Sequence, residues 1–387
     1  MSHPYNSQPD HAFWRRAIGD RAPDEIGDWY RRRFGLEGKT IATAGSCFAQ
    51  QLGRQLRRAG FQYLDAEPAP VDLPEDQHLD WGYSMYSARY GNIYTSRQLV
   101  QLFDRATGAF DPIEDHWEKD GGVVDPFRPT IEPEPFGSVA ELRALRRDHL
   151  DRVAEVLTKA DVLVFTMGLT EAWLSKRDGA CFPLCPGTAG GTFDPALHSL
   201  RNLSSAEVRA DMEAFLTRVR AINPRLEVLL TVSPVSMMAT ATAQQVSVAT
   251  VYTKSVLRAV AGELYDSHDF IDYFPSYDMV TGPASRGSFY KEGMREVSPE
   301  GVAYVMSHFL SEHPSPLEAP AAPSDPAPVQ TELKPRMAPG MAAPAPKPRM
   351  APGTTPAKAN IPADLTDDED VKCDEELLNS FAPKAKD

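Results

Sequence analysis

Apolar residues along this chain follow two alternating patterns. Short continuous runs have the length and composition of buried strands, and longer stretches carry apolar residues at helical spacing. The runs predicted as strands are residues 39–44, 161–167, 227–232 and 270–274. The stretches predicted as helices are residues 48–59, 140–157, 206–222, 247–264 and 299–310. This alternation predicts an α/β fold with right-handed crossovers, in which helices cover both faces of a mostly parallel central sheet.

Two long segments without regular periodicity interrupt the alternation. Residues 60–89 and the Pro-rich residues 108–136 are longer than ordinary connections, so we expect them to form a lid or a wall of a substrate site. In parallel sheets, ligands bind beyond the carboxyl ends of the strands. Cys47, residues 168–171 and Ser233 follow predicted strands and are therefore expected to meet at one rim of the sheet.

The composition changes after the last predicted helix. Residues 314–363 are rich in Pro and Ala, lack apolar periodicity and contain the heptapeptide KPRMAPG twice. Such a segment buries too little apolar surface to offset its ordering entropy, so we predict a disordered linker. The predicted parts are a helical N-terminal extension packed on the domain (1–38), the folded domain (39–313), the linker (314–363) and an acidic tail (364–387).

The acidic tail also contains a small apolar cluster, formed by Leu377, Leu378 and Phe381. A short helix with this cluster on one side would dock into the groove of a protein partner. The alternative is a tail that only increases solubility. Removing residues 314–387 should in either case leave the fold intact.

Charge and cysteine content exclude several classes of protein. The net charge of −14, from 54 acidic and 40 basic residues, disfavours binding to nucleic acid or anionic membranes. No apolar run reaches the length of a membrane span and no signal-peptide core is found, so we expect a cytoplasmic protein. The four cysteines are irregularly spaced, which predicts reduced thiols. Cys181 and Cys185 would need two further ligands to hold zinc, with His198 the only ligand type nearby, so no metal or other cofactor is expected.

The strongest candidate for chemistry lies where the first predicted strand meets the first predicted helix. The tripeptide Gly45-Ser46-Cys47 occupies this turn. Glycine permits a tight backbone, and the N-terminus of a helix favours an anion such as a thiolate or an oxyanion. The alternative is an ordinary turn with a small buried Cys.

Residues 43–49 read TAGSCFA and resemble the signature of the GSCFA family, a branch of the SGNH or GDSL-like hydrolases. Further blocks resemble this family in the same order along the chain, so that the resemblance covers about residues 13–309. These blocks are residues 90–95, 164–173, 233–235, 252–260 and 272–277. The resemblance implies a three-layer SGNH or flavodoxin-like sandwich.

The resemblance also implies roles for individual residues. Aligning Gly45 with the Gly of the Gly-Asp-Ser motif places Cys47 at the nucleophile, with Ser46 as its competitor. Gly91, Asn92, Gly168 and Thr170 would form or support the oxyanion-binding site, although the pattern has an Asn where this chain has Thr170. Unaided by the resemblance, Tyr-Gly-Asn at residues 90–92 is also an ordinary turn.

The general base is the weakest part of the match. The wider pattern has Asp-x-x-His before the last helix, whereas residues 293–296 of this chain read Gly-Met-Arg-Glu. Glu296 is one substitute, and His198 and Glu171 are others. The two carboxylates also have structural interpretations, since Glu296 precedes a helix start and Glu171 caps a helical turn. His198 is the best candidate among the His residues, and the surface is the expected place for His78, His116, His149, His268, His308 and His313.

These residues together lead to two hypotheses. The first is an esterase or O-acyltransferase that acts on a small acyl ester through a covalent acyl intermediate, with acetyl on a sugar or cell-envelope glycan as the substrate suggested by the resemblance. The second is a catalytically silent binding or scaffold protein that keeps the fold and recruits a partner through its tail. The missing Asp-x-x-His supports the second hypothesis.

Overall fold

The computed structural model describes residues 3–317 and 371–382. The predicted linker therefore lies outside the described residues except for residues 314–317, and so do both KPRMAPG repeats. The second described range belongs to the acidic tail.

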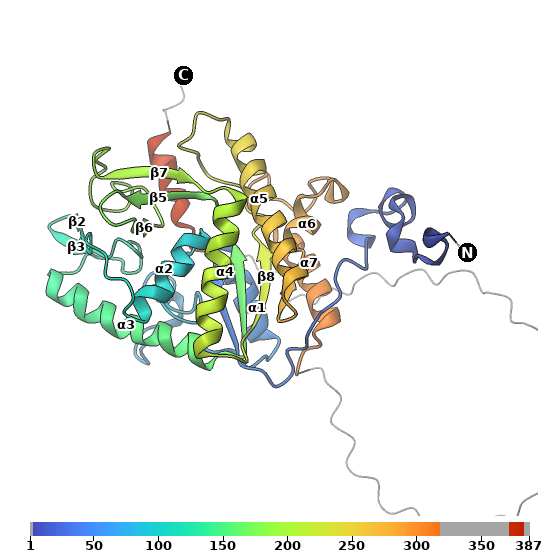
Figure 1. Cartoon of the computed structure of the whole chain (residues 1–387), viewed down its shortest axis with the longest axis horizontal. Coiled ribbons are helices and arrows are strands. Elements are labelled where there is room, and N and C mark those ends of the chain that lie inside the picture. The colour runs from blue at the N-terminus through green and yellow to red at the C-terminus, as the bar shows by residue number, and fades with distance from the viewer. Residues whose placement is uncertain (1–2, 318–370, 383–387) are drawn as a thin grey trace, which may run out of the picture.

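The centre of the molecule is a parallel sheet of four strands (Figure 1). In spatial order these are β1 (Ile41–Gly45), β4 (Val162–Met167), β8 (Glu227–Val232) and β9 (Ile271–Tyr273). Beyond β1, Ile41 forms a parallel bridge with Tyr63, so the segment that follows the first helix occupies the outer edge. This is the order 2-1-3-4-5 of flavodoxin-like doubly wound sheets. The predicted α/β fold with a mostly parallel sheet is confirmed.

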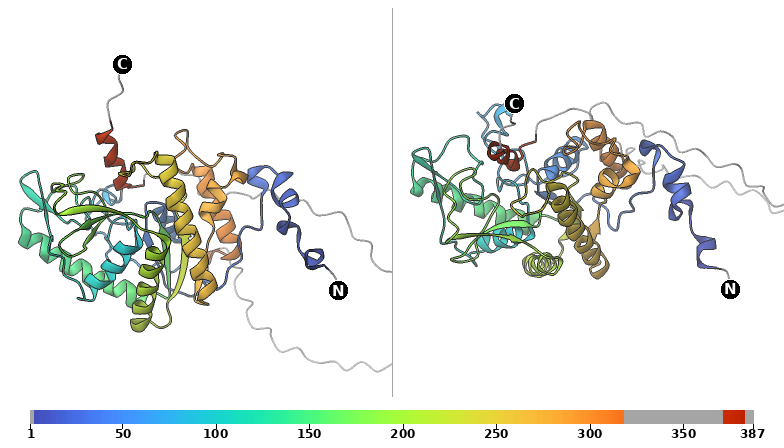
Figure 2. Two further views of the ribbon diagram at one scale, coloured as in Figure 1. Left: turned by 45° about the horizontal axis from the view of Figure 1, so that its top comes forward. Right: turned by 90° about the horizontal axis from the view of Figure 1, so that it is seen from above.

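Helices cover both faces of this sheet (Figure 2). Side chains alternate between the two faces along every strand, so that apolar side chains on each face need a covering layer. Leu163 and Phe165 join one hydrophobic cluster, whereas Val162 and Val164 join the other. The first cluster packs on α2 (Ser96–Ala106), α3 (Val139–Lys159), α4 (Ser205–Ile222) and α5 (Val246–Ser267). The second packs on α1 (Phe48–Arg58), α6 (Ser276–Thr281) and α7 (Pro299–Glu312).

Two small antiparallel sheets, neither of them predicted, extend one side of the domain. One consists of β5 (Glu171–Ser175), β6 (Cys181–Phe182) and β7 (His198–Asn202), with β5 in the middle. The other is the hairpin of β2 (Trp117–Lys119) and β3 (Gly122–Val124). The hairpin lies within the predicted long segment 108–136, which is therefore partly structured.

The N-terminal segment packs on the domain through its second half. Its described residues up to 25 form short helical turns, namely η1 (Pro4–Ser7), η2 (Asp10–Ala12), η3 (Arg15–Gly19) and η4 (Pro23–Glu25), none with a buried residue. Figure 1 shows this part projecting to the side. Ile26, Tyr30 and Leu36 are buried, and the Tyr30 hydroxyl donates to Asp272 Oδ2 at 2.8 Å.

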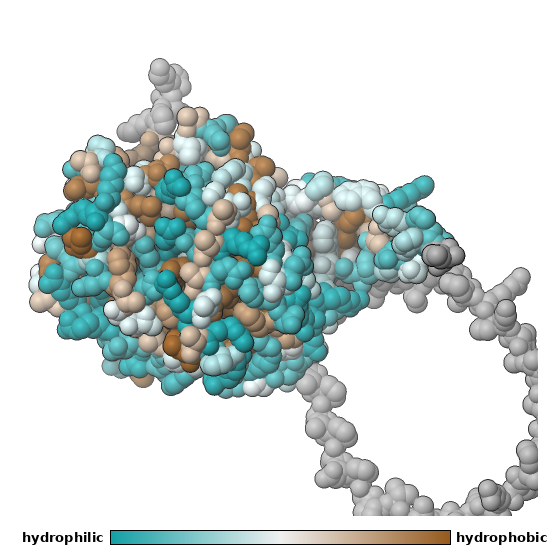
Figure 3. All heavy atoms as spheres, in the orientation of Figure 1, coloured by the Kyte–Doolittle hydropathy of each residue, from teal (hydrophilic) through white to brown (hydrophobic). Residues whose placement is uncertain are grey.

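The surface is mixed in character. On the face shown in Figure 3, hydrophobic residues occur in small groups among hydrophilic ones. None of the helices in the described ranges combines the length and apolar content that a membrane crossing requires.

Candidate active site

The turn that carries Cys47 is held tightly against the neighbouring strand. Gly45, the last residue of β1, has φ +138°, and a Cβ added there would lie 2.4 Å from the carbonyl oxygen of Thr166 on β4. The Ser46 amide donates to that same oxygen at 3.1 Å. Helix α1 begins at Phe48, so Cys47 is its N-cap residue. The sequence therefore places a thiol at the N-terminus of a helix and at the carboxyl end of a central strand.

Cys47 lines a cavity of about 330 Å³. The other lining residues come from α1, from the loop after β8, from the segment before α7, from α7 itself and from the tail: Phe48, Gln51, Val235, Lys291, Arg295, Glu296, Val297, Val302, Val371, Cys373 and Glu376. Ser46 is not one of them, and its buried hydroxyl oxygen has no hydrogen-bond partner within the described structure. Of the two predicted nucleophiles, Cys47 is the one whose side chain reaches the cavity.

Two cations lie close to the Cys47 thiol. Lys254 is fully buried on α5, and its Nζ donates to the carbonyl oxygen of Gly168 at 2.8 Å. Burial lowers the pKa of Lys254 to about 8, although Glu375 and Cys47 act in the opposite direction. The neighbouring Cys373 and burial raise the pKa of Cys47 well above its ordinary value, and Arg295 at the cavity wall opposes this shift. Both cations reduce the cost of a thiolate at this position.

Side-chain amides form a second part of the site. Asn92 is buried and follows Gly91, whose φ is +67°. The amide of the next residue, Ile93, donates to the Gly45 carbonyl at 2.8 Å. The Nδ2 of Asn92 and the Nε2 of Gln50 donate to one and the same oxygen, the carbonyl of Lys372, at 3.1 and 2.8 Å. Two donors that converge on one carbonyl oxygen form the arrangement required to stabilise an oxyanion.

A comparison with family models decides the relationship suggested by these residues. The GSCFA family model matches residues 40–309. The chain belongs to the GSCFA family.

The solved structures that match this GSCFA chain are distant from it. One is the crystal structure of an acetyl esterase mutant with acetate ion, at 9% identity and a TM-score of 0.32, with coverage of 70% of this chain and 93% of that one. Another is a carbohydrate esterase family 3 from Talaromyces cellulolyticus, at 13% identity and a TM-score of 0.25, with coverage of 56% and 87%. A comparison with curated proteins gave no match.

Of the other site residues predicted for this GSCFA domain, some lie at the cavity and others lie elsewhere. Glu296 lines the cavity, where its carboxylate lies 3.6 Å from Arg295 and 3.7 Å from Lys291. Gly168 packs against the turn, since a Cβ added there would lie 2.8 Å from Cβ of Ser46.

His198, Glu171 and Thr170 are not among the residues that line the cavity. The Nε2 of His198 lies 3.0 Å from Glu114 Oε2, and its ring packs between Phe182 and Phe193. The carboxylate of Glu171 accepts hydrogen bonds from the Thr240 hydroxyl and the Ala241 amide. The Thr170 hydroxyl donates to Asn202. These side chains hold β5 and β7 to their neighbours.

Two residues of the site were missed by the sequence analysis. Gln50 is a polar residue within the first turn of α1, and its only sequence signal is its position three residues after Cys47. Lys254 had a clearer signal, because it lies in register with the buried Leu257, Ala261 and Leu264 of α5. A lysine on the buried side of an amphipathic helix is rarely there for packing alone.

Potential metal ligands are scattered over the described structure. Among residues 3–317 and 371–382, no group of three or more His, Cys, Asp or Glu side chains is placed to hold a metal ion. Cys181 is buried next to the Thr95 hydroxyl, and burial raises its pKa to about 12.

Proposed function

We propose that this chain cleaves or transfers a small acyl ester, with Cys47 as the nucleophile. The observation that carries the proposal is the position of the Cys47 thiol in a cavity, at a helix N-terminus, with Lys254 and Arg295 nearby and the amides of Gln50 and Asn92 converging on one carbonyl oxygen. Thiolates are intrinsically strong nucleophiles and need less help from a general base than a serine hydroxyl does. This accounts for a site without the Asp-x-x-His pair.

The reaction consists of two acyl transfers. The Cys47 sulfur attacks the ester carbonyl carbon, the oxygen of that carbonyl becomes an anion facing the two amide donors, and the C–O bond breaks to release an alcohol that takes up a proton. Water or the hydroxyl of an acceptor then attacks the thioester, and the sulfur leaves as a thiolate. Glu296, which faces the cavity, is the residue we assign to accept the proton of the second nucleophile.

We propose acetyl or a similarly short group as the transferred unit, carried on a sugar or a glycan, as the family resemblance suggests. The cavity volume of about 330 Å³ does not define the substrate, because Val371, Cys373 and Glu376 of the tail form part of the cavity wall. The fold alone would not select this substrate.

The test is intact mass spectrometry after mixing the protein with p-nitrophenyl acetate, together with release of p-nitrophenol. We compare the wild type with Cys47→Ala and Ser46→Ala. An acetyl adduct and turnover that are lost only in Cys47→Ala are the expected result. An adduct lost only in Ser46→Ala would move the nucleophile to Ser46. Absence of both adduct and turnover in the wild type would favour a binding protein that uses the same fold.

A further inference from the structure

The described part of the acidic tail lies on the candidate active site. Residues 371–373 are extended, and η8 (Asp374–Phe381) continues from them as a short helix. In Figures 1 and 2 this helix lies at the same end of the domain as β5 and β7. Val371, Cys373 and Glu376 form part of the cavity wall next to Cys47. The tail thus returns to the site across residues 318–370, which lie outside the described ranges.

The backbone of the tail occupies the amide donors of the site. Besides accepting from Gln50 and Asn92 through its carbonyl oxygen, Lys372 donates its own amide to Gln50 Oε1 at 3.2 Å. The Gln50 side chain therefore pairs with a peptide unit in both directions. The carbonyl of Lys372 takes the place that we assigned to the carbonyl oxygen of an ester.

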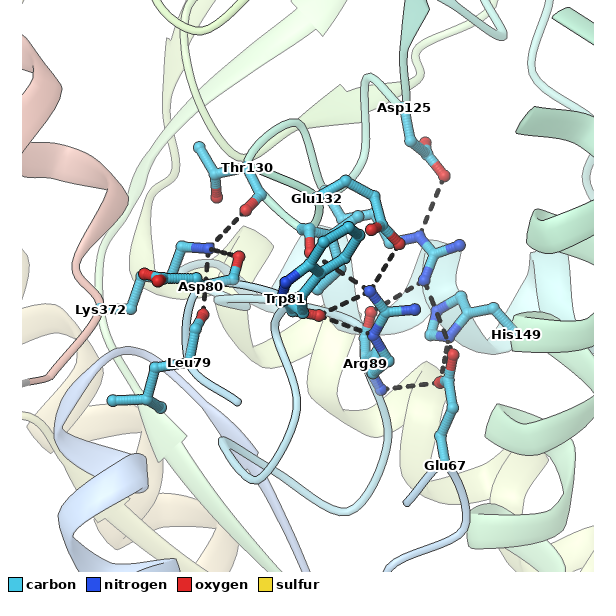
Figure 4. Close-up of polar contacts among 12 residues, drawn as sticks. Glu67, Leu79, Asp80, Trp81, Arg89, Asp125, Thr130, Glu132, His149 and Lys372 are labelled. Carbon is cyan, nitrogen blue, oxygen red and sulfur yellow. Dashed lines mark hydrogen bonds and ion pairs between the residues drawn. The ribbon is translucent and has the colours of Figure 1, made fainter. Parts of the chain in front are cut away.

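The side chain of Lys372 fits a socket formed by the two long inserted segments (Figure 4). Its Nζ donates to the carbonyl oxygens of Leu79, Asp80 and Thr130 at 3.2, 3.0 and 2.6 Å. An ammonium group has three donors, so these contacts satisfy it completely. Nearby, Arg89 bonds the carbonyl of Trp81 and the carboxylate of Glu132, which holds the two segments together.

Two acidic residues of the tail complete the contacts. Asp374 is buried and accepts from Asn92 Nδ2 at 2.8 Å through one oxygen and from the Thr130 hydroxyl through the other. Glu375 is also buried; it accepts from the Met238 amide at 3.4 Å and lies 3.8 Å from Arg295. Of the apolar side chains that the sequence suggested for docking, Leu377 and Phe381 are 40% and 64% exposed, whereas Leu378 is partly buried.

Cys373 faces the proposed nucleophile directly. The two thiols line the same cavity, and Arg295 Nη2 donates to the Cys373 sulfur at 3.5 Å. The neighbouring Cys373 thiol, burial and the carboxylate of Glu375 raise the pKa of Cys47 well above its ordinary value. The tail therefore covers Cys47 and disfavours its ionised form.

We propose that residues 371–381 are a tethered peptide ligand of the active site, which binds through Lys372, Cys373, Asp374 and Glu375 and competes with the acyl substrate. The competition rests on the proposed function, whereas the binding does not. The recognised chemistry is a short peptide with a basic residue two positions before an acidic pair. The site is then open only when the tail leaves its socket.

The first test is disulfide trapping in the full-length protein with diamide. The azo compound accepts two electrons and two protons from a pair of thiols and becomes a hydrazine, while a bond forms between their sulfur atoms. We expect a disulfide between Cys47 and Cys373 within one chain, identified by peptide mapping and by non-reducing electrophoresis. A disulfide between two chains would overturn the tethered form of the proposal, because the ligand would then be the tail of a second copy.

The second test measures alkylation of Cys47 by iodoacetamide in the wild type, Lys372→Ala and Asn379→Ala. Loss of three charge-assisted hydrogen bonds should release the tail and speed alkylation about tenfold or more in Lys372→Ala. Asn379 lies on the exposed side of the same short helix, so its substitution should leave the rate unchanged. Equal rates in all three proteins would overturn the proposal.

Ester turnover separates this inference from the proposed function. If both are correct, Lys372→Ala hydrolyses p-nitrophenyl acetate faster than the wild type by a factor similar to that for alkylation. Faster alkylation without turnover in any variant would support tail binding and overturn the proposed function. Turnover that is equal in the wild type and Lys372→Ala would overturn the competition.

Discussion

A single buried cation has a large effect on the chemistry available to Cys47. Lys254 lies at 2% exposure and is bound to the Gly168 carbonyl, so its charge acts on Cys47 through a medium that screens weakly. Replacing it by Met keeps the length and apolar character of the side chain but removes the charge. The pKa of Cys47 should then rise, because a positive neighbour no longer favours the thiolate.

We therefore expect the curve of Cys47 alkylation rate against pH to move to higher pH in Lys254→Met. The measurement is the iodoacetamide rate from about pH 6 to 10, on either side of the ordinary thiol pKa. Lys176→Met is the control, because Lys176 is exposed and its Nζ donates to the Pro195 carbonyl. An unchanged curve would mean that Lys254 only stabilises the carbonyl of Gly168. The shift is best measured in the Lys372→Ala background. Release of the tail there should move Glu375 and Cys373 away from Cys47, so that their effect on its pKa is smaller.

At the scale of elements, the turn between β1 and α1 depends on one glycine. A methyl group at Gly45 would meet three backbone atoms of Thr166 within 2.9 Å, and φ +138° is unfavourable for any residue with a Cβ. The two strands cannot move apart at this point, because β1 is paired with β4 along its whole length. We expect Gly45→Ala to lower the free energy of unfolding by about 2–4 kcal/mol.

Urea unfolding measures this loss, and Gly108→Ala is the matched control. Gly108 also has a positive φ, +75°, but no atom lies within 4 Å of an added Cβ. Its substitution should cost only the conformational strain, about 1 kcal/mol. Equal losses at the two positions would mean that contact with Thr166 is not what requires glycine at position 45.

Helices and strands were predictable from the sequence where a long pattern of apolar residues coincides with a buried face of the element. The strand predicted at residues 227–232 is β8, and the predicted helices at 140–157 and 247–264 lie within α3 and α5. Helix α2 was missed, although Thr95 and Gln98 form a capping box just before its apolar positions. Strands β5, β6 and β7 are short, with two to five residues each, and their pairing depends on partners elsewhere in the chain, so no local pattern identifies them.

The residues of the site also divide into those that the sequence predicts and those that it does not. Cys47 was predictable because its environment is local: a strand, a glycine and a helix start within a few residues. The neighbours that determine its reactivity are not local, since Lys254, Arg295 and Cys373 come from α5, the segment before α7 and the tail. Asn92 and Gln50 also have their functional geometry only because both meet the backbone of residue 372. Such contacts follow from topology, which the sequence pattern indicates only coarsely.

At the scale of the whole molecule, one buried cluster joins the N-terminal segment to the last strand and the last helix. The Tyr30 hydroxyl donates to Asp272 on β9 and lies 3.0 Å from Nε2 of His313, the residue that ends α7. Since that hydroxyl already donates its proton, Nε2 of His313 must be the donor in this contact. The Nδ1 of His313 is buried with no partner in the described structure, so protonating it would bury an unpaired charge.

This cluster predicts how stability depends on pH. Burial lowers the pKa of His313 to about 4, against an ordinary value near 6.5, and burial beside Arg128 lowers that of His149 to about 4 as well. Between these pH values the unfolded chain binds protons that the folded chain does not, so stability is present above pH 6.5 and is lost as the pH falls toward 4. Each histidine accounts for about 1.4 kcal/mol per pH unit within that window.

Urea unfolding of the wild type, His313→Gln and His11→Gln at intervals from about pH 7.5 to 4.5 checks this prediction. The glutamine amide can still donate to Tyr30 but cannot be protonated, so the slope of stability against pH should fall by up to about 1.4 kcal/mol per pH unit in His313→Gln. His149 and His308, whose pKa values burial also lowers, retain their own contributions. His11 is 48% exposed, and its variant should retain the slope of the wild type. If His313→Gln also kept the full slope, the cluster would join the two ends of the domain without linking their stability to protonation.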